Sequence, residues 1–231
     1  MIFAAGRGTR LSPLTDSRPK ALVEIEGITL LERVVRRLVA AGVTEAIINL
    51  HHFGEQIPLF LAARNNLGLK RVAYSEEPEL LDTGGGLRQA AAFFDDRQPF
   101  LVHNADVLSD IDLAGLVRTH VASGALATLA AKARPTARPL FFDSANRLVG
   151  RRSPSLGDVT VRPPVGAIQE LGFCGIQVLD PSLLDRLTES GPFPIVQAYL
   201  RLAGEGADIR CARLDAARWR DCGRPEDLRP L

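Results

Sequence analysis

The sequence has little of what would support covalent or metal-based stabilisation. Among its 231 residues are three cysteines, Cys174, Cys211 and Cys222, an odd number without C-x-x-C spacing. This usage argues against a disulfide framework and against a structural zinc site, and it fits a reducing compartment. We therefore expect a cytoplasmic protein.

Long apolar runs and a strong net charge are also missing. No uninterrupted apolar stretch approaches the ~20 residues of a membrane span, and the N-terminus lacks the charged-then-apolar layout of a signal peptide. The formal net charge of +1 provides no overall field toward nucleic acid or a membrane surface. We expect neither as a partner, so anion binding must come from local clusters of cations.

Two well-known phosphate loops are absent from the start of the chain. Leu11 stands where the dinucleotide fingerprint G-x-G-x-x-G needs its third glycine. Gly8 is followed by Thr9 and Arg10, whereas the P-loop needs lysine and then serine or threonine. A Rossmann dehydrogenase and a P-loop enzyme are therefore disfavoured.

What is present is an apolar start that runs into a loop of small residues with cations. The segment 4–15 reads AAGRGTRLSPLT, and Lys20 follows it. Small residues let backbone N–H groups approach a ligand, and successive N–H groups form an anion-binding nest. With Arg7, Arg10 and Lys20 beside the nest, the segment suits a polyphosphate. The alternative is a glycine turn with surface arginines.

Hydrophobic patterns along the chain alternate between helix and strand. The predicted helices cover residues 28–41, 54–63, 87–94, 112–123 and 195–204, with one more from Pro181. The predicted strands cover residues 45–50, 71–75, 100–104, 125–132, 171–179 and 208–214. This order predicts a doubly wound, mainly parallel sheet, and no linker is long enough to divide residues 1–231 into two domains.

Regularity weakens in two places. A hairpin is predicted around Asn146, and residues 151–164, rich in Ser, Pro, Gly and Arg, are expected to form a mobile loop. Residues 219–226 (WRDCGRPE) are expected to be turn-like.

Acidic and glycine-rich segments supply further candidates. Asp106 follows the apolar strand 100–104, at the end where open α/β sheets bind ligands, and Mg²⁺ prefers carboxylate and phosphate oxygens. The alternative is a capping role before Asp112. By composition alone Asp221 would be a surface residue. The run 82–86 (DTGGG) is either a helix N-cap or a place where backbone closely approaches something flat or bulky.

Together these segments resemble the sugar-1-phosphate nucleotidyltransferases. The resemblance is carried by residues 4–20, by the strand ending at Asp106, by the glycine run and by residues 219–226. It implies a Rossmann-like α/β domain with a mixed, mostly parallel central sheet flanked by helices. It also implies that a nucleoside triphosphate and a sugar 1-phosphate are converted to a nucleotide sugar and pyrophosphate.

The resemblance implies a role for each matching residue. It implies that Arg10, Lys20 and Asp106 are catalytic, and that Asp106 and Asp221 bind Mg²⁺. The nucleotide would be bound by Ala5, Gly6, Gly8, Thr9, Arg10, Thr83, Gly84 and Gly85. The sugar would be bound by Asn104, Glu170 and Gly175.

The branch of the family is less defined. Residues 79–86 and 49–57 most resemble N-acetylmuramate-1-phosphate uridylyltransferases, which implies UTP and an amino sugar. Ala105 and Arg224 depart from the usual glycine and threonine, and the lysine that many relatives use on the sugar phosphate has no clear counterpart at 134–164. The alternatives are a mannose-1-phosphate guanylyltransferase-type enzyme and a non-catalytic, nucleotide-sugar-binding regulatory protein.

Overall fold

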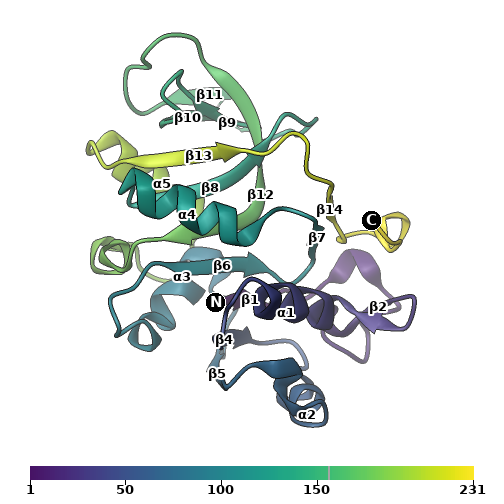
Figure 1. The fold of residues 1–231 in the computed structure, drawn as a ribbon. Helices are drawn as coiled ribbons and strands as arrows, with labels where there is room; N and C mark the ends of the chain where they lie inside the picture. The colour runs from purple at the N-terminus through teal and green to yellow at the C-terminus, as the bar shows by residue number, and fades with distance from the viewer. Residues whose placement is uncertain (156) are drawn as a thin grey trace.

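The computed structural model describes residues 1–155 and 157–231, and a large mixed sheet forms its centre (Figure 1). The strands of this sheet are β1 (Ile2–Phe3), β4 (Glu45–Leu50), β5 (Arg71–Glu76), β6 (Phe100–Asn104), β8 (Ala127–Lys132), β9 (Leu140–Phe142), β10 (Leu148–Ser153), β11 (Gly157–Thr160), β12 (Gln169–Leu179) and β13 (Ile209–Arg213). Their order is β11-β10-β9-β12-β6-β1-β4-β5, and β8 joins β12 to β13. Two short ladders, β2 (Glu24–Ile25) with β3 (Ile28–Thr29) and β7 (Val107–Ser109) with β14 (Trp219–Asp221), lie beside it.

The strands around β1 are parallel. β1 pairs in parallel with both β4 and β6, and β4 pairs in parallel with β5, so their C-terminal ends share one edge of the sheet. The long strand β12 runs antiparallel to β6, β8 and β9. The expected mixed sheet flanked by helices is therefore confirmed, with its parallel part centred on β1.

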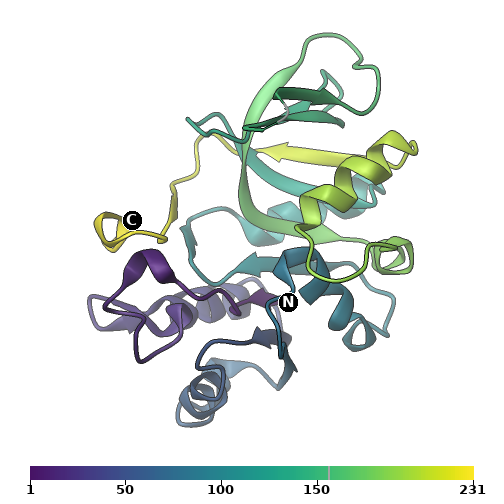
Figure 2. The ribbon, with the colours of Figure 1, turned by 180° about the vertical axis from the view of Figure 1, so that it is seen from behind.

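Helices cover both faces of the sheet (Figures 1 and 2). They are α1 (Leu30–Ala40), α2 (Gln56–Ala62), α3 (Asp82–Gln89), α4 (Leu113–Ser123) and α5 (Ile195–Gly204). Side chains of α1, α2 and α4 join one buried apolar cluster, and those of α3 and α5 join another. Burial of these apolar stripes on the two faces of the sheet is the main stabilising contribution.

Local signals in the sequence set the ends of α1. Thr29 precedes the helix, and its hydroxyl accepts a hydrogen bond from the backbone N–H of Glu32 at 3.1 Å. The apolar stripe of the helix is buried, and Gly42 follows its end with a φ of 93° that favours glycine. This helix therefore matches the predicted one closely, because its cap, stripe and stop are all local in sequence.

Three predicted segments are corrected by the structure. The predicted helix 87–94 begins earlier, as α3, and contains the glycine run; a 3₁₀ turn, Ala91–Phe93, follows it. The predicted helix from Pro181 is a 3₁₀ helix, Pro181–Arg186. The predicted turn at 219–226 begins with strand β14, which forms because β7 offers it a partner.

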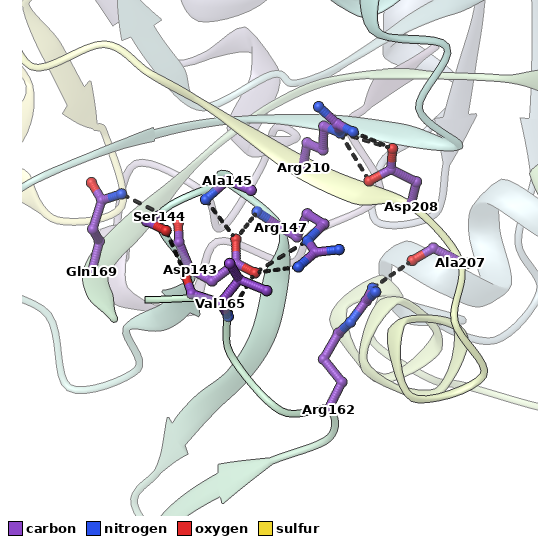
Figure 3. Close-up of polar contacts among 10 residues, drawn as sticks. All are labelled: Asp143, Ser144, Ala145, Arg147, Arg162, Val165, Gln169, Ala207, Asp208 and Arg210. Atoms are coloured by element: carbon purple, nitrogen blue, oxygen red, sulfur yellow. Dashed lines mark hydrogen bonds and ion pairs between the residues drawn. The ribbon is translucent and has the colours of Figure 1, made fainter. Parts of the chain in front are cut away.

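The prediction of a loop over residues 151–164 is wrong where two strands, β10 and β11, enter the segment. β10 continues to Ser153, and β11 pairs with it antiparallel, while Leu156 lies outside the described residues. Arg162 then donates a hydrogen bond of 3.0 Å to the carbonyl oxygen of Ala207 (Figure 3). Because these partners are distant or depend on strand pairing, composition alone did not indicate an ordered hairpin.

The hairpin around Asn146 is confirmed and is closed by the fully buried Asp143 (Figure 3). The carboxylate accepts backbone N–H groups of Ala145, Arg147 and Val165 and an ion pair of 2.9 Å from the Arg147 guanidinium. Burial by itself would raise the pKa of Asp143, but these donors bring the pKa below its usual value. Asp143 therefore ties the hairpin turn to the segment before β12.

Candidate active site

The parallel strands end beside a cavity of about 450 Å³. It is lined by the backbone of residues 3–6, by Lys20, and by residues at strand ends, namely Asn49, Glu77 and 104–106. This is the edge at which open α/β sheets bind ligands. The structure thus brings Ala5, Gly6, Lys20, Asn104 and Asp106, all predicted from the sequence, to one cavity.

The first loop uses its two glycines differently. A Cβ atom added at Gly6 would meet nothing within 4 Å, so Gly6 leaves its side of the loop open. Gly8 has a φ of 65°, and a Cβ atom there would lie 2.9 Å from Cβ of Lys20 and from Cγ2 of Thr15. Gly8 therefore lets the loop pack onto Lys20, whereas Gly6 leaves room for a ligand.

Lys20 and Asp106 form an ion pair at the cavity. Lys20 is only 8% exposed and belongs to the 3₁₀ turn Lys20–Leu22, while Asp106 lies two residues after the end of β6. The predicted cation and the predicted carboxylate therefore meet across the sheet edge. In a site of reduced dielectric constant their attraction is stronger than at an open surface.

The β7–β14 ladder brings Asp221 to the same place. Asp221 is paired with Val107, and the N–H of Cys222 donates to the carbonyl oxygen of Asp106 at 2.8 Å. Although solvent reaches the Asp221 side chain, partial burial raises its pKa, and the negative charge of Asp106 raises it further. Two neighbouring carboxylates repel each other unless a cation lies between them.

Arg10 from the first loop approaches the same C-terminal segment. A Cβ atom at Gly223 would lie 2.6 Å from Nη2 of Arg10 and 2.7 Å from Oδ1 of Asp221. The charge of Arg10 also lowers the pKa of Asp221, against the larger effect of burial. Gly223 therefore makes room for the guanidinium, a role that the sequence analysis missed although the residue lay inside a recognised motif.

The donor set at this place suits a hard divalent cation. Within residues 1–155 and 157–231 no group of three or more His, Cys, Asp or Glu side chains could hold a metal ion. Asp106 lines the cavity, and Asp221 lies near enough for the charge of Asp106 to raise its pKa, so two carboxylates are available. Mg²⁺ is typically held by one or two carboxylates together with substrate phosphates and water, so the residues fit it.

A buried polar network was missed by the sequence analysis. Asn49 and Glu77 are each 3% exposed; Asn49 is the penultimate residue of β4, and Glu77 directly follows β5. Asn49 accepts from Ala4 N at 2.6 Å and donates to Glu77 Oε1 at 2.7 Å, and Leu81 N donates to Glu77 Oε2 at 2.9 Å. The network joins the ends of β1, β4 and β5 to the start of α3. The sequence signal that could have revealed this network was a polar residue near the C-terminal end of each of two apolar strands.

The glycine run has a packing role within the chain. A Cβ atom at Gly84 would lie 2.1 Å from the ring of Phe193, and one at Gly85 would lie 2.9 Å from Gly191 O. The N–H groups of Gly84 and Gly85 donate to Phe193 O at 2.8 and 3.4 Å. The expected close approach is thus to this chain's own phenylalanine. Of the residues assigned to the nucleotide here, Thr83 lines the cavity and the two glycines do not.

Of the three residues predicted to bind the sugar, Asn104 and Gly175 lie together in the structure, and Glu170 lies apart from them. Gly175 has a φ of 69°, and a Cβ atom there would lie 2.8 Å from Nδ2 of Asn104. Glu170 does not line the cavity. Its carboxylate instead binds the guanidinium of Arg152 at 2.9 Å. Glu170 therefore lies apart from the cavity that Asn104 lines.

These features define a class of protein. Parallel strand ends carry a small-residue loop with cations, a lysine–aspartate pair and a second carboxylate that the chain's C-terminal part supplies. Cations beside a loop of small residues suit phosphate groups, and neighbouring carboxylates are ligands that a divalent cation prefers. The protein is thus a nucleotide-binding α/β enzyme of phosphate chemistry.

Comparison with known proteins makes the family specific. The profile of the nucleotidyl transferase family matches residues 1–142. N-acetylmuramate alpha-1-phosphate uridylyltransferase of Caulobacter vibrioides is 32% identical over 98% of this chain and 92% of its own length. Mannose-1-phosphate guanyltransferase of Gibberella zeae is 31% identical over 99% of this chain and 61% of its own length. The chain belongs to the nucleotidyl transferase family.

Solved structures share the fold. UDP-glucose pyrophosphorylase from Acinetobacter baumanii superposes with a TM-score of 0.78 at 21% identity, over 98% of this chain and 89% of that one. The expected class, a sugar-1-phosphate nucleotidyltransferase, is confirmed. A search of the described residues for a helix long and apolar enough to span a membrane finds none.

Proposed function

We propose that the protein transfers a uridylyl group from UTP to an amino sugar 1-phosphate related to N-acetylmuramate 1-phosphate, releasing pyrophosphate. The observation that carries the proposal is the meeting of Lys20, Asp106 and Asp221 beside the first loop. The choice of UTP and of the sugar is supported by the name of the Caulobacter vibrioides relative. Residues 1–231 would act as one catalytic domain, and three buried, unlinked cysteines suit a cytoplasmic enzyme.

The first loop would hold the triphosphate. The backbone of Ala5, Gly6, Gly8 and Thr9 provides the cradle, and Gly6 leaves its side open. Arg10 would contact the β- and γ-phosphates, since its guanidinium lies beside Gly223 and Asp221. A planar guanidinium can form two parallel hydrogen bonds to phosphate oxygens, which fixes the leaving pyrophosphate in direction as well as in place.

Lys20 would act at the reacting centre. Its Cβ atom lies against Gly8 and its ammonium pairs with the carboxylate of Asp106, so the side chain is held at the junction of the loop and the strand end. In-line attack by the sugar phosphate on the α-phosphorus needs positive charge near the equatorial oxygens, and no covalent enzyme intermediate is required. Asp106 and Asp221 would hold Mg²⁺, which supplies a second positive charge to these oxygens.

The acceptor would bind on the other side of Asp106. Asn104 lines the cavity, and Gly175 lies directly against its amide group. An amide can donate to and accept from sugar hydroxyl groups. The base would lie toward Thr83, where Asn49 and Glu77 form the cavity floor. Positioning both substrates around one phosphorus atom would supply much of the rate enhancement.

A second candidate is GTP with a mannose-type sugar 1-phosphate. It is favoured by the 31% identity to the Gibberella zeae guanyltransferase. A non-catalytic regulatory protein is disfavoured because Arg10, Lys20, Asp106 and Asp221 all occupy one site.

The test is a pyrophosphate-release screen. Equimolar UTP, dTTP, GTP, CTP and ATP are each offered with a panel of sugar 1-phosphates, with D106N as the inactive control. We expect the highest kcat/KM for UTP with an amino sugar 1-phosphate. A preference for GTP with mannose 1-phosphate would establish the second candidate. Release of no pyrophosphate from any pair, with intact nucleotide binding, would establish the regulatory alternative.

A further inference from the structure

The single tryptophan of the chain lies next to the proposed metal site. Trp219 is two residues before Asp221 on β14, so both side chains lie on the same face of that strand. The indole N–H donates to the carbonyl oxygen of Cys174 at 2.8 Å. This bond ties β14 to β12 immediately before Gly175, on the predicted sugar side.

Arg134 covers the ring of this tryptophan. Its Cζ atom lies 4.2 Å from the ring centroid, and Nη2 donates to Phe173 O at 2.8 Å. Gly172 makes the approach possible, because a Cβ atom there would lie 2.6 Å from Nε of Arg134. Among the described residues, the buried Nε of Arg134 has no hydrogen-bond partner. The guanidinium is therefore held by the indole ring together with the carbonyl oxygen of Phe173.

The two residues before Arg134 bind the segment that connects β13 to β14. Lys132 donates to Ala217 O at 2.5 Å, and Ala133 N donates to Asp215 Oδ1 at 2.7 Å. Lys132, the last residue of β8, and the two residues that follow it thus hold the segment 215–219, which leads from β13 into β14. β14 is only three residues long, pairs with β7 alone and stands apart from the large sheet (Figure 1). Its pairing by itself is a weak constraint on where Asp221 points.

We propose that the Arg134–Trp219 stack positions Asp221 for the divalent cation. The stack fixes the orientation of the β14 face that bears Trp219 and Asp221, and pairing with β7 fixes the register of the strand. The carboxylate of Asp221 is thereby held close to Asp106. Arg134 is a positioning residue, since it acts through Trp219. The inference rests on the proposed role of Asp221 as a metal ligand.

The test uses the fluorescence of Trp219, which reports on the site independently of turnover. Wild type, R134A, R134K, R138A and D221N are titrated with MgCl₂ in the presence of inorganic pyrophosphate, which does not absorb at the excitation wavelength. R138A removes an exposed arginine four residues away and is the matched control. The Mg²⁺ dependence of turnover and the KM for UTP are measured for the same proteins.

We expect R134A to raise the Mg²⁺ concentration at the fluorescence midpoint by roughly tenfold, as other supports of metal ligands do. R134K should restore it only in part, because a lysine lacks the planar stacking surface. The KM for UTP at saturating Mg²⁺ should change much less, and R138A should behave like wild type.

Two outcomes separate the possible failures. If D221N shifts the midpoint while R134A and R134K titrate like wild type, Arg134 has no positioning role. If D221N itself titrates like wild type, the proposed metal role of Asp221 is wrong, and this inference is wrong with it. If R134A does not fold, R134K and W219F are used instead. W219F lacks the fluorophore, so its Mg²⁺ dependence is measured by turnover. Wild-type behaviour of both variants would refute the proposal.

Discussion

Lys20 and Asp106 form an ion pair between two segments that lie far apart in the sequence, with Lys20 only 8% exposed. Each group compensates the charge of the other. The pair joins two of the groups that we propose for catalysis, the ammonium for phosphate oxygens and the carboxylate for a divalent cation.

Replacing Asp106 should affect both activity and stability. For D106N we expect turnover to fall by about two to three orders of magnitude. The buried ammonium of Lys20 loses its carboxylate, so the free energy of unfolding should fall by about 1–2 kcal/mol, moderated by the partial exposure of Asp106. Activity assays and urea unfolding at pH 7 check this. Combined with K20A, the two stability losses should be less than additive, and strict additivity would contradict a direct interaction.

The two glycines of the first loop should respond oppositely to alanine. G6A meets no neighbour, so its melting temperature should match wild type, while the KM for the triphosphate rises by roughly tenfold as the cradle narrows. G8A requires a left-handed conformation and crowds Lys20 and Thr15, so it should unfold more easily by about 1–3 kcal/mol. Calorimetry and initial rates distinguish them. Equal loss of stability in both would show that Gly6 does not face open space.

G84A should be a stability mutation. The added methyl group would overlap the ring of Phe193, which is 3% exposed and lacks room to move, so we expect a loss of more than about 2 kcal/mol. A double-mutant cycle with F193A, followed by denaturant unfolding, should show a coupling between the two sites. If G84A folded normally but lost only nucleotide affinity, the glycine would contact the ligand and not Phe193.

Asp143 should give a pH-dependent stability. Its pKa is lower in the folded protein than in the unfolded chain, so its contribution is present above the unfolded pKa of about 3.9 and is lost as pH falls through the folded value. D143N should therefore be less stable than wild type by roughly 2–4 kcal/mol at pH 7, with the difference shrinking below about pH 4. Urea unfolding from pH 7 down to about pH 2 measures it, because the contribution is lost below the unfolded pKa. A constant difference across this range would mean that the carboxylate charge is irrelevant.

Much of the fold could be predicted from local sequence, and so could the position of one candidate site residue, Asp106. The cap, stripe and stop of α1 lie within a few residues of one another, and β4 and β6 were predicted with the bounds that the structure has. Asp106 was expected at the C-terminal end of this strand, and it lies two residues after β6. Features of this kind depend on residues that are neighbours in the chain, so periodicity and turn chemistry reveal them.

Tertiary structure decided the remainder. Asp221 reaches Asp106 only because β14 pairs with β7, and Arg10 reaches it only because Gly223 leaves room. The glycine run looked like a ligand loop, but the ring that it accommodates belongs to Phe193. Glu170 was expected to bind the sugar, but its carboxylate binds Arg152 of strand β10. Each of these outcomes depends on which distant segments the sheet brings together, and a one-dimensional pattern contains no distance between such segments.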